Sequence, residues 1–156
     1  MIDEHRAAMD KALRFLSARA HSTRELRDKL LTRDFSMGVV DSVLEECARR
    51  GFLNDRLFAE FCLEEFKGRG YGPRKCMMYL RNKGIESAMI EEVMAEKHDA
   101  TDELSQAEEV MRRKLRSLAR ESDPMKKKEK AIRFMAGRGF SFELANRVYA
   151  RLTQKE

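Results

Sequence analysis

The stretch AMDKALRFLSARAHSTRELRDKLLTRDFSMGVVDSVL, residues 8–44, is matched without a gap by FAEFCLEEFKGRGYGPRKCMMYLRNKGIESAMIEEVM, residues 58–94. A shift of 50 residues relates the two stretches, and most apolar positions of the first fall on apolar positions of the second. The matched pairs include Leu13 and Leu63, Leu30 and Leu80, and Val43 and Val93. Self-similarity at such a period is the signature of a repeat architecture. The chain is therefore expected to contain copies of one structural unit.

A third, weaker copy follows further along the chain. It aligns with the second at a shift of 52 and, after three inserted residues, at a shift of 55. Gly84 then falls on Gly139, and Ile85 falls on Phe140. The polar segment Lys97–Ser105 between the copies is predicted to be a flexible joint. The predicted repeats cover residues 1–53, 54–98 and 104–153.

Within each copy the apolar residues recur at helical spacing. The set that falls at i, i+3, i+4 and i+7 is Met9, Ala12, Leu13 and Leu16, which predicts one buried helix face. Leu26 and Leu30 mark a second helix, and Val40 and Val43 mark a third. One three-helix unit buries little alone, whereas stacked copies share a continuous core. The predicted fold is all-α, with three tandem three-helix repeats forming an elongated, curved array.

Polar residues and glycines mark the predicted helix ends. Ser22-Thr23-Arg24-Glu25 has the capping-box pattern, in which the serine and glutamate side chains satisfy early backbone N–H groups. Single side chains expected to cap later helices are Ser36, Asp55 and Ser141. Left-handed residues are expected where helices end, at Asp34, Gly84 and Gly139.

Composition narrows the class of protein. The chain has 156 residues, of which 38% are charged and 42% hydrophobic, so it can bury a core and is not expected to be disordered. The three cysteines, Cys47, Cys62 and Cys76, form no CxxC motif, which argues against a metal site and suits a reducing cytoplasm. No signal-peptide core and no membrane-spanning apolar stretch is present.

The net charge of +5 is unevenly distributed, because residues 101–156 carry fourteen Lys or Arg and nine Asp or Glu. Acid-free or nearly acid-free basic runs occur at 67–85, 112–120 and 126–133. Such runs are either solvated helix faces or a surface for an anionic partner, a nucleic acid or an acidic protein groove. The residues predicted to form a basic contact face are Lys67, Arg69, Arg74, Lys75, Arg81, Lys83, Lys127, Lys130, Arg133 and Arg138.

Three segments carry a resemblance to a known family. The stretch GFLNDRLFA at residues 51–59 resembles the signature between the first two repeats of RecX regulatory proteins. The stretches KGRGYGP at 67–73 and LRNKGI at 80–85 are similar to that family's second repeat, and Ser22-x-x-Glu25-Leu26-x-x-Lys29-Leu30 to its first. The resemblance covers about residues 8–150. Asn54 and Asp34 depart from the family pattern, where an acidic residue and a glycine are common.

This resemblance implies a regulator of the RecA recombinase with no catalytic residues and no cofactor. RecX proteins bind the groove of RecA filaments on single-stranded DNA and dampen ATP hydrolysis, strand exchange and coprotease activity. The resemblance thus implies a role in recombination, DNA repair and the SOS response. The chain is expected to be a cytoplasmic monomer with weak, non-specific affinity for DNA and none for membranes.

Two other functions are weighed against this one. Basic three-helix units also occur in helix-turn-helix proteins, so a nucleic-acid-binding module that acts without RecA is the alternative. An enzyme is disfavoured, because no Ser/His/Asp or Cys/His arrangement has local support. Gly68-x-Gly70-x-Gly72 is flanked by predicted helices and not by a strand, so it is interpreted as a helix–helix connection and not as a phosphate loop. Tyr71 within it either packs under the loop or stacks on a base.

Overall fold

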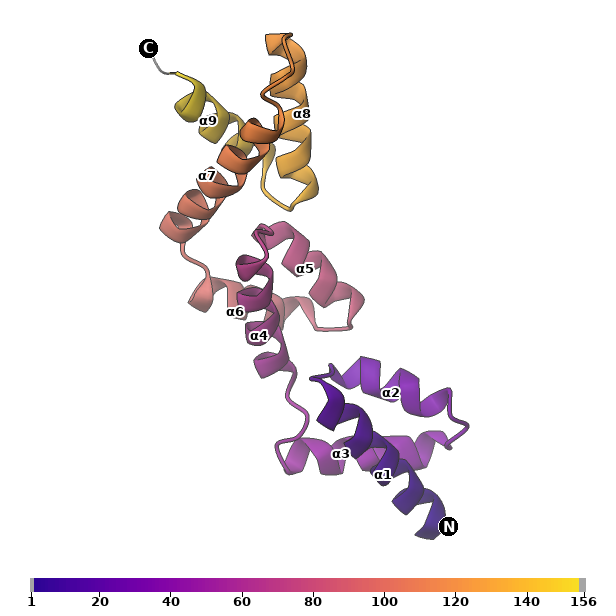
Figure 1. Ribbon diagram of the computed structural model, residues 1–156. Coiled ribbons are helices and arrows are strands. Elements are labelled where there is room, and N and C mark those ends of the chain that lie inside the picture. The colour runs from indigo at the N-terminus through magenta and orange to yellow at the C-terminus, as the bar shows by residue number, and fades with distance from the viewer. Residues whose placement is uncertain (1, 155–156) are drawn as a thin grey trace. The chain divides into compact units, whose positions relative to one another are not determined.

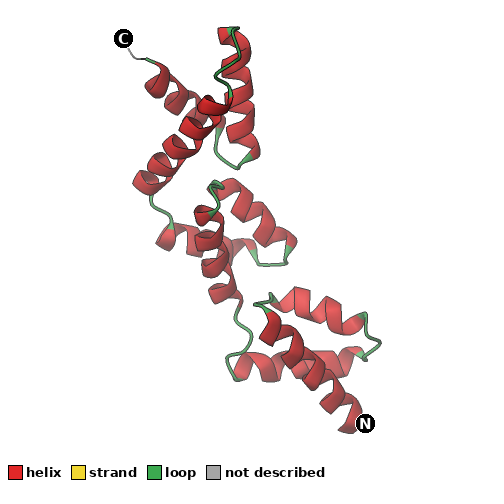
Figure 2. Cartoon of the chain, viewed as in Figure 1, coloured by secondary structure: helices red, strands yellow, loops and turns green. Residues whose placement is uncertain are grey.

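The computed structural model describes residues 2–154, and within them it contains nine helices and no strand (Figures 1 and 2). The helices are α1 (Ile2–Ala18), α2 (Thr23–Leu31), α3 (Met37–Arg49), α4 (Asp55–Gly68), α5 (Pro73–Asn82), α6 (Ser87–Lys97), α7 (Ala100–Ser117), α8 (Pro124–Gly137) and α9 (Phe142–Thr153). The all-α prediction is confirmed.

Residue contacts divide the chain into two compact units. Unit 1 contains the described residues up to Phe61 together with Leu80–Glu92, and unit 2 contains Cys62–Tyr79 and the described residues from Val93 onward. This division passes through α4, α5 and α6, all of which belong to the predicted second repeat. The repeat boundaries at 1–53, 54–98 and 104–153 stay a prediction.

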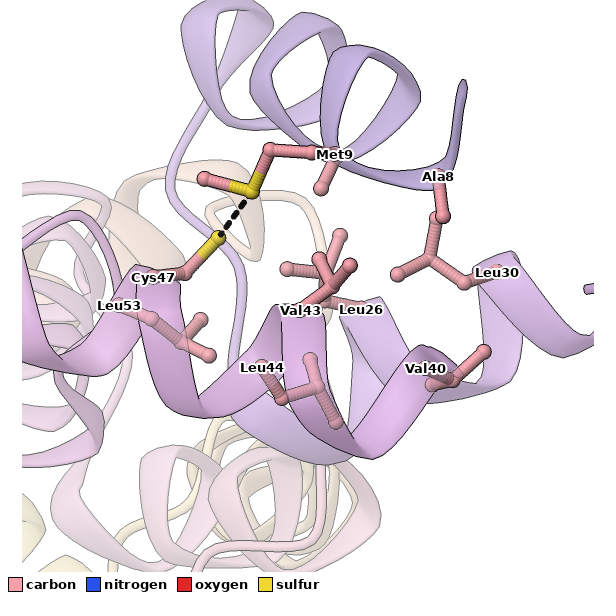
Figure 3. Close-up of a cluster of buried hydrophobic side chains, with 10 residues drawn as sticks. Ala8, Met9, Leu26, Leu30, Val40, Val43, Leu44, Cys47 and Leu53 are labelled. Carbon is pink, nitrogen blue, oxygen red and sulfur yellow. Dashed lines mark hydrogen bonds between the residues drawn. The ribbon is translucent and has the colours of Figure 1, made fainter. Parts of the chain in front are cut away.

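The core of unit 1 lies where α1 and α2 pack on α3. Figure 3 shows Met9 of α1, Leu26 of α2 and Val43 of α3 directed into this core, with the Cys47 Sγ donating to the Met9 Sδ at 4.0 Å. The small side chains of Ala8 and Ala12 are fully buried and let α1 approach its neighbours closely. The predicted buried face is therefore wrong at Leu13, which is 36% exposed because the buried stripe runs through the alanines beside it.

The core of unit 2 lies among α7, α8 and α9, which cross one another in the orange and yellow part of Figure 1. Phe140 is its largest fully buried side chain, and Met111, Met135 and Val148 pack with it. The prediction that Phe140 takes an apolar repeat position is confirmed by this burial.

The structure confirms some predicted caps and corrects others. The capping box is present, because Ser22 Oγ accepts from the Glu25 N–H at 3.1 Å and the Glu25 carboxylate accepts from the Ser22 N–H. Ser141 caps α9 by accepting from the Leu144 N–H at 3.0 Å. The Ser36 prediction is wrong: its side chain makes no cap bond, and its backbone N–H donates to Glu4 instead.

Asp55 is also not the cap of α4, because it is the first residue of the helix. The cap is Asn54, whose side-chain oxygen accepts from the Leu57 N–H at 3.1 Å. The carboxylate of Asp55 instead accepts from the backbone and side chain of Thr23 at 2.8 and 3.0 Å. The Asp55 side chain, which the local pattern assigned to the helix end, therefore binds Thr23, a residue distant in sequence.

The expected left-handed residues are confirmed, since Asp34, Gly84 and Gly139 have φ of 66°, 84° and 101°. The expected flexible joint Lys97–Ser105 is largely helical. Asp99 caps α7 by accepting from the N–H groups of Thr101 and Asp102, so the helix begins as early as Ala100.

Candidate partner-binding surface

Unit 1 contains a junction between the start of α2 and the loop that joins α5 to α6, here called the first junction. Ser22 Oγ donates to the Lys83 carbonyl at 2.6 Å, and the Arg24 guanidinium donates to the Asn82 carbonyl at 2.6 Å. Gly84 follows in that loop, and a Cβ there would come within 2.6 Å of the Arg24 side chain. The contact is therefore close enough to require glycine.

The cations of the first junction are neutralised from within the chain. The Glu25 carboxylate pairs with the Arg19 guanidinium and lies 3.0 Å from the Lys83 Nζ. Its side chain is only 10% exposed. Burial opposes ionisation, but the hydrogen bonds from Arg19 and Lys83 outweigh it and lower the pKa of Glu25 to about 2. This cluster is an internal ion-pair network and contains its own anion.

Unit 2 contains a second junction, between the start of α5 and the loop that joins α8 to α9. The Gly72 N–H donates to the Arg138 carbonyl at 2.7 Å, and the Arg74 N–H donates to the Gly139 carbonyl at 3.1 Å. A Cβ on Gly139 would lie 2.6 Å from the backbone nitrogen of Lys75. The 50- and 55-residue shifts place Ser22 on Gly72 and Lys83 on Arg138, so the bond between Gly72 and Arg138 repeats the one between Ser22 and Lys83. The same shift places Asn82 on Gly137, whose carbonyl accepts from the Lys75 Nζ at 3.4 Å.

The charge at the second junction is different. The 50-residue shift that places Arg19 on Arg69 also places Glu25 on Lys75, so the internal carboxylate is replaced by a third cation. Lys75 Nζ and the Arg138 guanidinium both lie over the Tyr71 ring, 5.2 and 4.8 Å from its centroid. The Arg138 guanidinium also donates to the Arg69 carbonyl at 3.1 Å. Arg69, Lys75 and Arg138 thus lie together without an equivalent of the buried Glu25 carboxylate, and Arg69 pairs only with the exposed Glu65 at 3.4 Å.

A cleft of about 240 Å³ opens beside this junction and is here called the basic cleft. Its lining residues are Arg69, Gly70, Val110, Arg113, Lys114, Ser117, Phe134 and Arg138. Four are cationic, and among the described residues no carboxylate lines the cleft. Arg113 and Lys114 belong to the basic run at 112–120, which the sequence shows, yet neither is among the predicted contact residues. Only the folded chain brings α7 against the loop that carries Arg69.

The ten predicted contact residues are divided between the two units. Arg69, Lys75 and Arg138 come together at the second junction, and Arg74 lies exposed beside them at the start of α5. Lys67 lies near the end of α4, where its ammonium is 3.7 Å from Glu64. Four of the ten predicted contact residues therefore lie close together at the second junction.

The remaining predicted residues lie elsewhere. Lys127, Lys130 and Arg133 are on α8 and do not line the cleft; Lys130 pairs with Glu121 at 2.7 Å. Arg81 is exposed at the end of α5 in unit 1, and Lys83 belongs to the first junction. A single continuous basic face through all ten stays a prediction.

The segment with three spaced glycines joins α4 to α5, as expected for a helix–helix connection. Tyr71 within it is half-buried and packs against Phe66, with ring centroids 5.5 Å apart. The three cysteines are buried thiols, and burial raises the pKa of Cys76 to about 12. Within residues 2–154 no helix is long and apolar enough to cross a membrane, and no His, Cys, Asp and Glu cluster is arranged to hold a metal ion.

Family models match two parts of the chain. The model described as RecX, first three-helix domain, matches residues 8–47, and the model described as RecX, third three-helix domain, matches residues 101–149. The second match covers the copy that is weakest in the internal comparison of repeats.

Relatives and solved structures agree with these models. A protein named Regulatory protein RecX from Legionella pneumophila is 33% identical over 143 residues, which cover 91% of this chain and 92% of the relative. One of the same name from Vibrio vulnificus is 31% identical over 134 residues, covering 86% of this chain and 85% of the relative. The crystal structure of RecX from Lactobacillus salivarius superimposes with a TM-score of 0.85 at 18% identity, covering 97% of this chain and 98% of that one. This last likeness shows the fold.

Proposed function

Because the chain belongs to the RecX family of regulatory proteins, we propose that it binds the RecA filament on single-stranded DNA and inhibits its ATPase, strand-exchange and coprotease activities. It thereby modulates recombination, DNA repair and the SOS response. It acts in the cytoplasm as a monomeric binding protein and not as an enzyme.

The observation that supports this proposal is the set of cations at the second junction that share no buried carboxylate of the kind that Glu25 provides at the first. Lys75 and Arg138 are held there over the Tyr71 ring, so they need little rearrangement to meet an anionic surface. The Arg69 side chain beside them is exposed. A filament of one protein on DNA repeats the same protein and phosphate groups along its axis. Several weak ionic contacts made at once by one folded protein add through avidity.

The experiment is a RecA ATPase assay on circular single-stranded DNA, with this protein titrated to excess over RecA. We expect hydrolysis to fall in proportion to the protein added and to approach a minimum. Unchanged hydrolysis at excess protein would contradict the proposal.

A charge-reversal pair tests whether the second junction is responsible. The variant Arg74→Glu with Lys75→Glu should need at least tenfold more protein for half-inhibition, because acidic groups now repel the filament. The matched control is Arg6→Glu with Arg49→Glu, which changes net charge equally at exposed positions on α1 and α3. Equal loss in both variants would show that only total charge matters.

A further inference from the structure

We propose that the basic cleft binds phosphate groups of a single-stranded nucleic-acid backbone. The inference deepens the proposed function by naming the part of the protein that contacts the DNA of the filament. It does not require RecA, because the cleft can be tested on DNA alone. Failure of DNA binding at the cleft and failure of RecA inhibition are therefore separate outcomes.

The first junction shows how cations in this arrangement hold an anion. In the first junction a carboxylate lies between Arg19 and Lys83, at hydrogen-bonding distance from both. The equivalent residues of the second junction are Arg69 and Arg138, and the residue equivalent to Glu25 is Lys75. The second junction thus has cations at the equivalent positions but no carboxylate at the position of Glu25. A bound ligand can supply that anion.

The cations of the cleft come from three segments, and two of them, Lys114 and Arg138, are held in place by a neighbouring ring. Arg69 comes from the α4–α5 loop, Arg113 and Lys114 from α7, and Arg138 from the residue after α8. The Arg138 guanidinium lies over the Phe134 ring at 5.1 Å, and the Lys114 ammonium lies over the same ring at 4.6 Å. Side chains that are already positioned lose less conformational entropy when a ligand binds.

Two carboxylates stand at the edge of this site. Glu65 pairs with Arg69 at 3.4 Å, and Glu109 pairs with Arg113 at 3.7 Å. Both pairs are exposed, with the glutamates 45% and 54% accessible, so each contributes little and exchanges readily. Lys114 and Arg138 have no carboxylate within ion-pair distance among the described residues. A phosphate group can therefore bind without displacing a buried ion pair.

The chemistry of the cleft favours a phosphate backbone over a base. Three of its four cations are arginines, whose planar guanidinium groups bind phosphate oxygens in pairs. The aromatic rings of Phe134 and Tyr71 each already carry two cations, so they are not free platforms for base stacking. The volume of about 240 Å³ lies below the 300 Å³ or more typical of pockets that enclose a whole small molecule. Binding should therefore be independent of base sequence.

The test measures fluorescence anisotropy of a labelled oligo-dT strand titrated with this protein in the absence of RecA. The variant Arg69→Ala with Arg113→Ala removes two exposed cleft cations, which are 70% and 67% accessible, so the fold should persist. We expect its dissociation constant to rise at least tenfold. The slope of log affinity against log salt should fall by about 1.4, because each phosphate contact to a single strand contributes about 0.7.

The matched control is Arg6→Ala with Arg49→Ala, which removes the same charge from α1 and α3 and should raise the dissociation constant less than threefold. Circular dichroism of each variant checks that the helices are retained. Equal weakening in both double variants would overturn the assignment of the cleft. Absence of DNA binding by the unaltered protein would overturn it too.

A second pair of variants uses the comparison of the junctions directly. Lys75→Glu restores the carboxylate found in the first junction and should neutralise Arg69 and Arg138 from within. Lys75→Ala only removes one charge. We expect Lys75→Glu to weaken oligo-dT binding several times more than Lys75→Ala, whereas equal effects would contradict the idea that the cluster lacks an anion.

Competition separates the possible sources of the anion. Poly-glutamate at equal charge concentration, or ATP at equal phosphate concentration, should fail to displace the labelled strand. Displacement by poly-glutamate would assign the cleft to an acidic protein segment, and displacement by ATP would assign it to a free nucleotide. Either result would overturn the proposal, as would a strong preference between oligo-dT and a mixed-sequence strand.

Discussion

At the scale of single residues, the replacement of Glu25 by its repeat equivalent Lys75 has the largest effect on the charge of the two junctions. Sequence pattern correctly assigned Glu25 to a capping box, because the bond to Ser22 spans only three residues. The pattern could not show that the same carboxylate also binds Lys83, 58 residues away. Local spacing identifies caps, whereas long-range ion pairs depend on how loops meet after folding. The sequence alone therefore did not reveal that the two junctions are equivalent and differ in charge.

Glu25→Gln should destabilise unit 1 by about 1–2 kcal/mol at pH 7, because it removes a partly buried charge that two cations stabilise. The pKa of Glu25 is about 2 when folded, below its value of 4.5 in an unfolded chain. Its contribution is therefore complete above pH 4.5 and lost as pH falls toward 2. Urea denaturation at pH 7 and pH 3 should show the difference from the unaltered protein shrinking by more than half. A difference that is constant with pH would show that the charge is not the cause.

At the scale of elements, most helices and their ends follow from the sequence. Helical spacing and the residues Ser22, Ser141, Gly84 and Gly139 placed helix ends correctly. The errors have a common cause. The local pattern assigned caps wrongly to Ser36 and Asp55, because both residues make tertiary contacts instead. The Ser36 backbone N–H donates to Glu4, and the Asp55 carboxylate accepts from Thr23.

The two serine caps provide a matched pair of variants. Ser141→Ala should cost about 1 kcal/mol, because the Leu144 N–H at the start of α9 loses its acceptor. Ser36→Ala should change stability by less than about 0.5 kcal/mol, since its side chain makes no cap bond. Chemical denaturation of both variants measures the contrast. Equal costs would mean that the serine at position 36 caps α3 in solution.

The glycines at the second junction allow a sharper test of that contact. Gly139→Ala places a Cβ 2.6 Å from the Lys75 nitrogen at a residue with φ of 101°, so it should cost more than about 2 kcal/mol. Gly38→Ala is the control, because nothing lies within 4 Å of its Cβ in α3, and it should stabilise by about 0.4–1 kcal/mol. Urea midpoints report both effects. A tolerated Gly139→Ala would show that the α8–α9 loop is not held against α5.

At the scale of the whole molecule, the sequence predicted an anionic partner. It identified only some of the residues that form the proposed contact surface. The excess of basic residues in 101–156 was evident from composition. Arg113 and Lys114 were missed as contact residues because an acid-free run does not reveal what lies opposite it. Lys83 was included although Glu25 neutralises it. Charge counting finds the basic part of a chain, and packing decides which of its cations remain available.

Inhibition of RecA should depend on salt if these available cations make the contact. Exposed charges are screened over about 8 Å at physiological ionic strength, so two or three such contacts should raise the half-inhibiting concentration roughly tenfold between 50 and 200 mM salt. The measurement is the ATPase titration at each salt concentration, with RecA alone as the baseline. An opposite outcome would point to Met125 and Phe142, which are 78% and 61% exposed and line a second hollow with Ile132. The other residues that line this hollow are Lys128, Glu129 and Arg133. Contacts made by these apolar side chains would strengthen or stay constant as the salt concentration rises. A half-inhibiting concentration that is constant within twofold would therefore assign the contact to Met125 and Phe142 and not to the basic cleft.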